Sequence, residues 1–110
     1  SREIVYETTA TAPPEELHRF FLACREDGFQ PARRRLRELL DRFGLAGTDL
    51  VNQLHRGLGD VPFLTEGQKL SVTQTMAEAD FRMVEGGGEA LQLDAMTARL
   101  CTLLSPEMKS

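Results

Sequence analysis

The sequence predicts an all-α protein, folded as a compact bundle of about five helices. Apolar residues recur at helical spacing through five segments of the 110-residue chain. Glycine and proline separate these segments at short intervals, so consecutive helices are expected to be largely antiparallel neighbours. No sustained alternation of apolar and polar residues is present that would predict a β-sheet.

Proline opens the first two predicted helices, because its fixed φ and missing N–H suit a first helical turn. The first helix follows Pro13 and Pro14 and ends at Gly28, with Leu17, Phe20, Phe21 and Cys24 at helical spacing. The second runs from Pro31 to Phe43, with one apolar face made of Ala32, Leu36, Leu39, Leu40 and Phe43. Residues 1–12 are therefore assigned to a lead-in or linker.

Threonine precedes the third and fourth predicted helices as a helix cap. Thr48 is expected to cap a helix ending at Arg56, and Thr65 a long helix over residues 66–85. The triple glycine at 86–88 ends that helix and permits a left-handed turn into a fifth helix, residues 89–104. The helical domain is thus placed at residues 13–105, with a tail at 106–110.

Composition favours a soluble globular domain. The chain is 41% hydrophobic and 27% charged, with a formal net charge of −4. This acidic balance gives no overall attraction to nucleic acid or to anionic membranes. Cys24 and Cys101 are widely separated, which favours two small buried hydrophobes in a reducing compartment over a CxxC motif. No apolar run is long enough to span a membrane, so no membrane partner is expected.

The fourth and fifth helices carry more apolar surface than one core requires. The fourth has two stripes, Leu70, Ala77, Phe81 and Val84 on one side and Val72, Met76, Ala79 and Met83 roughly opposite. The fifth has a main apolar face, and its far side is covered by Leu91, Ala95, Ala98 and Thr102. Because a monomer needs only one stripe toward its core, the second is interpreted as a subunit interface. The predicted interface residues are Val72, Met76, Ala79, Met83, Leu91, Ala95 and Ala98.

Five arginines lie in the segment 33–42, RRRLRELLDR. One interpretation is contact with phosphate, with Arg34 and Arg37 as the candidate DNA contacts. The other is a solvated helix face, because arginines and acids are spaced for i,i+4 ion pairs, namely Arg34–Glu38, Arg37–Asp41 and Glu38–Arg42. The charge balance of the segment favours the second interpretation.

An alternative function follows from the first interpretation, a small helical DNA-binding domain that uses the Arg33–Arg42 helix. The helix after it would then be the second element of a helix-turn-helix, presenting Asn52 and Gln53 to base edges. The acidic composition of the chain argues against this reading, because such domains need a basic footprint.

No motif predicts catalysis, metal binding or a cofactor in this chain. His18 and His55 have no partners at ligand spacing, and no Ser/His/Asp or Cys/His arrangement is supported. The glycines at 86–88 lack the Lys-Ser/Thr ending of a phosphate-binding loop and are followed by Glu89, which would repel phosphate. The chain is therefore expected not to be an enzyme by itself and to bind no cofactor.

Several segments resemble the C-terminal domain of the replication factor C small subunit, a clamp-loader family. These are Pro14-Glu15-Glu16, Gly28-Phe29, Gly44-Leu45-Ala46-Gly47, Gln53-Leu54-His55-Arg56 and, most specifically, Ala77-Glu78-Ala79-Asp80-Phe81-Arg82 with Glu85-Gly86 and Leu91-Gln92-Leu93. Gly87-Gly88 stands where the family usually has Ala-Asn.

The resemblance implies a collar domain that joins subunits into a pentameric ring. In the family the ring loads a sliding clamp onto primer–template DNA during replication, and its partners are other replication factor C subunits, the clamp and DNA. ATP and Mg belong to an AAA+ ATPase part of the parent protein, none of whose motifs lies in this chain. A cytoplasmic location is expected for an archaeal source, which is preferred, and a nuclear one for a eukaryotic source.

Overall fold

The computed structural model describes residues 10–106, and these residues form five α-helices and no strand. The helices are α2 (Pro14–Glu26), α3 (Phe29–Phe43), α4 (Gly47–Gly57), α5 (Glu66–Val84) and α6 (Glu89–Leu104), with a 3₁₀ turn, η1 (Leu58–Asp60), after α4. The predicted all-α bundle of about five helices is confirmed.

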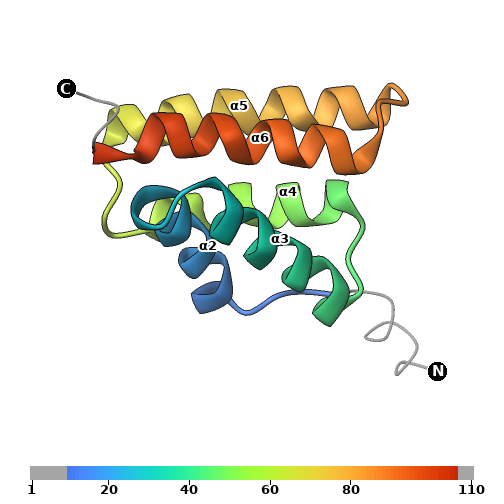
Figure 1. Ribbon diagram of the computed structural model, residues 1–110, viewed down its shortest axis with the longest axis horizontal. Helices are drawn as coiled ribbons and strands as arrows, with labels where there is room; N and C mark the ends of the chain where they lie inside the picture. Colours follow the sequence, from blue (N-terminus) through green and yellow to red (C-terminus); the bar gives the residue numbers. More distant parts are fainter. Residues whose placement is uncertain (1–9, 107–110) are drawn as a thin grey trace.

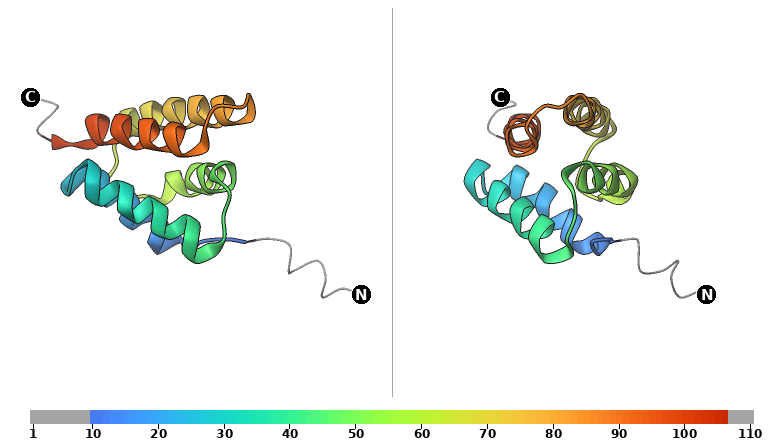
Figure 2. Two further views of the ribbon diagram at one scale, coloured as in Figure 1. Left: turned by 45° about the vertical axis from the view of Figure 1, so that its right-hand side comes forward. Right: turned by 90° about the vertical axis from the view of Figure 1, so that its right-hand side faces the viewer.

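The helices form two layers (Figure 1). The antiparallel pair α5 and α6 makes one layer, and α2, α3 and α4 lie below it. Seen along the hairpin in Figure 2, α6 lies nearer α2 and α3, whereas α5 lies nearer α4. Each layer therefore has one side that faces the other layer and one side that faces solvent.

The hydrophobic core fills the space between the two layers. All five helices contribute side chains that are at most 2% exposed, among them Phe20, Phe21, Leu36, Leu39, Leu50, Leu54, Val72, Met76, Leu100 and Leu104. Burying one such side chain stabilises the fold by roughly 1.5–3 kcal/mol relative to leaving it exposed. The apolar series predicted for the first three helices are mostly part of this core.

Two helix starts differ from the sequence prediction. Helix α3 begins at Phe29 and not at Pro31, because Gly28 adopts φ +97° and its carbonyl accepts the N–H of Ala32 at 3.1 Å. Helix α4 begins at Gly47, with the extended Ala46 before it, so Thr48 is not its cap. Proline and threonine suit a first turn in both cases, but they do not fix which residue starts it.

The predicted cap of α5 is confirmed. The hydroxyl of Thr65 accepts the N–H of Gln68 at 3.1 Å, and the Gln68 side chain accepts the N–H of Thr65 at 2.9 Å. This reciprocal pair is a capping box, which satisfies two backbone donors that the helix leaves free.

A glycine turn closes the α5–α6 hairpin. Gly86 adopts φ +103°, the N–H of Gly87 donates to the carbonyl of Arg82 at 2.8 Å, and the N–H of Gly86 donates to that of Met83 at 3.1 Å. These two bonds form a Schellman motif. A Cβ on Gly87 would lie 2.8 Å from the Arg82 carbonyl oxygen, so both positions require glycine.

Candidate subunit interface

The outward face of α5 is apolar, and it is not the face expected from the sequence. Leu70, Phe81 and Val84 are 68%, 62% and 69% exposed, and Ala77 between them is exposed too. These residues form the stripe that points away from the core. We refer to Leu70, Ala77, Phe81 and Val84 as the α5 stripe.

The predicted interface residues of α5 lie in the domain's own core, which corrects the face assignment. Val72 is 0% exposed, Met76 1% and Ala79 5%, and Met83 is half-buried against the same core. These side chains face the lower layer and are inaccessible to a second subunit while the domain is folded. Helical periodicity showed two stripes, but it could not show which stripe the other helices cover.

The predicted interface residues of α6 lie on the surface. Leu91 is 69% exposed, and Ala95 and Ala98 are exposed as well. The opposite side of the helix is buried and contributes Leu93, Met96, Leu100 and Leu104 to the core. We refer to Leu91, Ala95 and Ala98 as the α6 face, and its role in assembly stays a prediction.

A groove of about 630 Å³ runs between α5 and α6. Polar groups from both helices line much of it, including Gln74, Glu78 and Arg82 of α5 and Gln92 and Arg99 of α6. A second hollow of about 500 Å³, lined by Ser71, Arg99 and Leu103 among others, continues toward the start of α5. Leu91 and Ala95 of the α6 face also line this groove, whereas no residue of the α5 stripe does.

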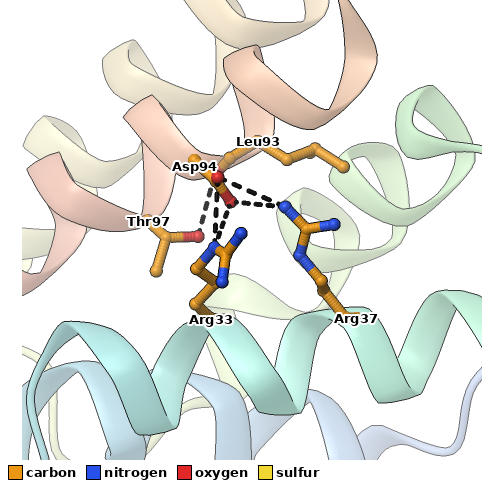
Figure 3. A network of polar contacts seen from close by, with 5 residues as sticks. All are labelled: Arg33, Arg37, Leu93, Asp94 and Thr97. Carbon is orange, nitrogen blue, oxygen red and sulfur yellow. Dashed lines mark hydrogen bonds and ion pairs between the residues drawn. The ribbon is translucent and has the colours of Figure 1, made fainter.

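The arginine-rich helix is held to α6 by one carboxylate (Figure 3). The Asp94 carboxylate lies 3.1 Å from the Nε of Arg33, and it accepts bonds from the Nη2 of Arg37 at 3.1 and 3.2 Å. These groups are partly exposed, at 26% for Asp94 and 36% and 42% for the two arginines. Two of the five arginines are therefore paired with α6.

The i,i+4 pairs expected within α3 are not formed in the part of the chain that the structure describes. None of the ion pairs there joins Arg34 to Glu38, Arg37 to Asp41 or Glu38 to Arg42, and Arg42 instead lies 3.7 Å from Glu16 of α2. Three of the five arginines of α3 are thus paired with acids of neighbouring helices. These partners lie on other helices, which i,i+4 spacing within α3 does not reach.

Arg34 and Arg37, the candidate DNA contacts, differ in their surroundings. Arg34 is exposed, whereas Arg37 is paired with Asp94.

Gln53, which the helix-turn-helix hypothesis placed at base edges, is only 7% exposed. Its amide oxygen accepts the N–H of Ala12 at 2.9 Å, and its amide nitrogen donates to the carbonyl of Ala10 at 2.9 Å. Gln53 fastens the lead-in segment to α4, so its base-reading role is ruled out in this fold.

Glu89, at the start of α6, contacts the start of α4. Its carboxylate accepts the N–H of Gly47 at 2.5 Å. A carboxylate at that position is favoured by the partial positive charge of a helix N-terminus. A Cβ on residue 47 would lie 2.7 Å from the Glu89 side chain, so a larger residue there would displace the carboxylate from this contact.

The two cysteines lie together, which their spacing in the sequence did not predict. They line one hollow between α2 and α6, and both are free thiols. The hydrogen bond between the thiols, together with burial, raises the pKa of Cys24. The same hydrogen bond lowers the pKa of the less buried Cys101.

Among residues 10–106, no three His, Cys, Asp or Glu side chains are grouped as a metal site would require. Within the same residues no helix is long and apolar enough to cross a membrane. Neither His18 nor His55 is brought into a cluster of potential metal ligands.

Comparison with known proteins gives one consistent result. The family model "Replication factor C C-terminal domain" matches residues 12–99. Proteins named replication factor C small subunit are similar to the chain, at 38% identity over 98 residues in Natronomonas pharaonis, 37% over 101 in Archaeoglobus fulgidus and 37% over 105 in Methanosarcina acetivorans. The alignments cover 89%, 92% and 89% of this chain but only 30–31% of each relative. The chain thus spans about a third of the length of these relatives.

Proposed function

The chain belongs to the family of replication factor C C-terminal domains, and on that premise we propose that it is the oligomerisation collar of a DNA sliding-clamp loader. The subunits would assemble through this domain into a pentameric ring that loads the clamp onto primer–template DNA. Its direct partners would be other replication factor C subunits, identical or related.

The observation that carries the proposal is the α5 stripe. Leu70, Phe81 and Val84 are each more than 60% exposed, and they point away from a core that is already filled by the other side of α5. An apolar stripe of this kind on a folded domain is typical of a surface that another protein covers.

Two separate surfaces would let the domain build a closed ring. A ring of like subunits uses heterologous contacts, in which one surface of each copy meets a different surface of the next. The α6 face borders the groove, which Leu91 and Ala95 line, and the α5 stripe lies outside it, so the hairpin offers two such surfaces. Because both surfaces lie on the α5–α6 hairpin, they support a role for this hairpin in subunit contacts.

The domain is proposed to be non-catalytic and to hold no cofactor. It corresponds to the C-terminal part of replication factor C small subunits, and ATP and Mg would be bound by an AAA+ part of the parent protein. The similarity to archaeal relatives favours an archaeal, cytoplasmic setting.

Sedimentation velocity over a concentration series tests the assembly surface. The chain is expected to self-associate, and the double substitution Phe81→Asp with Val84→Asp is expected to leave it monomeric with an unchanged helical spectrum. Leu22→Asp is the matched control, because Leu22 is 41% exposed but lies on α2 in the other layer. A wild-type chain that stays monomeric up to roughly 1 mM, the weak limit of specific association, would refute self-assembly through this surface.

Direct DNA contact through α3 stays an untested alternative, and titration with duplex DNA at several salt concentrations distinguishes it. We expect weak binding that Arg34→Ala does not change further. A steep salt dependence that Arg34→Ala reduces would instead favour the DNA-binding function.

A further inference from the structure

Cys24 lies near the C-terminal end of α2 and Cys101 near that of α6, and these two helices pack against each other (Figure 1). Both line a hollow of about 440 Å³. Cys24 is 1% exposed, whereas Cys101 is half-buried. The site therefore contains one reachable thiol backed by one concealed thiol.

We propose that this pair is a modification site, at which a small disulfide compound oxidises Cys24 and Cys101 to an intramolecular disulfide joining α2 to α6. The hollow supplies the access that such a reagent needs, and the packing of the two helices supplies the proximity of the second thiol. This inference concerns the folded chain and does not rest on the proposed assembly.

The reaction proceeds by two thiol–disulfide exchanges. The Cys101 thiolate attacks one sulfur of the reagent, forms a mixed disulfide and releases one reagent thiolate. The Cys24 thiol then loses its proton to that thiolate or to solvent, and its sulfur attacks the Sγ of Cys101. The second reagent thiol leaves. Two protein thiols are oxidised by two electrons in total, and one reagent disulfide is reduced to two thiols.

Exposure decides the order of the two steps. Cys101 faces the hollow with part of its surface open, so it reacts first. Its lowered pKa increases the thiolate fraction, which is the reactive form. Cys24 is buried and its pKa is raised, so it reacts poorly with the reagent itself. It is therefore suited to the second step, in which it attacks the mixed disulfide already formed on Cys101.

The charges around the hollow determine the probe. Arg25, Glu26 and Asp27 all line it, so a charged reagent would respond to their fields as well as to the thiols. Bis(2-hydroxyethyl) disulfide is neutral and small and avoids this complication.

Mass spectrometry of the chain treated with this probe is the test. The wild-type chain is expected to lose two hydrogens without keeping a reagent group, and peptide mapping should join an α2 peptide to an α6 peptide. Cys24→Ala should instead accumulate the mixed disulfide on Cys101. Cys101→Ala should react much more slowly, because only the 1% exposed Cys24 remains.

A denatured control separates the native site from the ordinary reactivity of two thiols. The effective concentration of the Cys24 thiol at Cys101 should be at least about tenfold higher in the native chain than in urea. The melting temperature of the oxidised chain should be about 10 °C higher than that of the reduced chain. A stable mixed disulfide on wild-type Cys101, or disulfide-linked dimers alone, would overturn the proposal. The peptide map uses the wild-type chain and remains decisive even where a variant is unstable.

Discussion

Asp94 of α6 and Arg37 of α3 are joined by paired contacts of 3.1 and 3.2 Å, and the same carboxylate also binds Arg33. One acid thus connects the upper layer of the bundle to the arginine-rich helix of the lower layer. The connection lies on the side of α6 that adjoins its buried face.

Removing that acid should destabilise the domain modestly. Asp94→Ala leaves two guanidinium groups facing each other without their shared acceptor, so we expect the free energy of unfolding to fall by about 1–2 kcal/mol. Urea denaturation measures the change, and added salt should reduce it. Glu78→Ala is the control, because its pair with Arg82 is exposed at 62% and 56% and should contribute under about 0.5 kcal/mol. Equal losses in the two variants would contradict a special role for Asp94.

Replacing Gln53 should weaken the attachment of the lead-in segment. Gln53→Leu fills similar volume but leaves the Ala12 N–H without its acceptor in a buried position, which costs about 1–3 kcal/mol. The expected result is a lower melting temperature and faster hydrogen exchange at the Ala12 amide. Asn52→Leu is the neighbouring control, since Asn52 is exposed and bonds only within its own helix. Unchanged exchange at Ala12 would show that the segment is held by other contacts.

The Glu89 contact predicts a graded response to two substitutions. Glu89→Ala removes the acceptor of the Gly47 N–H and the negative charge at the start of α4, and should lower the free energy of unfolding by about 1 kcal/mol. Glu89→Gln keeps an acceptor oxygen without the charge, so a smaller loss is expected. Thermal melts followed by circular dichroism measure both. A glutamine variant as unstable as the alanine variant would assign the whole effect to charge.

The two sides of α5 should respond in opposite ways to an introduced charge. Met76→Asp places an unpaired carboxylate in the core, at a cost comparable with the roughly 5–15 kcal/mol stability of a typical domain, so the variant should be largely unfolded. Phe81→Asp changes a surface residue and should leave the melting temperature nearly unchanged. A folded Met76→Asp variant would instead support the sequence-based prediction that Met76 lies in the subunit interface.

Periodicity and turn residues predicted the number and order of the helices because these signals are local. Gly44 and Gly86 adopt left-handed conformations after α3 and α5, as helix-ending glycines do. The start of α3 could not be placed at Phe29, because it depends on the backbone of Gly28 and not on the proline that usually marks such a start.

The faces of α5 and the partners of α3 depend on neighbours far along the chain. Two apolar stripes on one helix look equivalent until the helices that cover one of them are positioned. The sequence prediction therefore placed Met76 in the interface, although Met76 is buried and Phe81 is exposed. Asp94 lies more than fifty positions from Arg37, and i,i+4 spacing offered only local partners. The proximity of Cys24 and Cys101 depends on the same long-range packing of α2 and α6.

The two hydrogen bonds of Gln53 to Ala10 and Ala12 also connect the lead-in segment mechanically to α4. Ala10 and Ala12 are hydrogen-bonded to a side chain of α4, although the first helix that follows them in the chain is α2. A pull or twist applied to the backbone at residue 10 therefore reaches α4 directly, and α4 packs against α5. The helix with the outward apolar stripe is thus one packing contact away from the helix that holds residues 10–12.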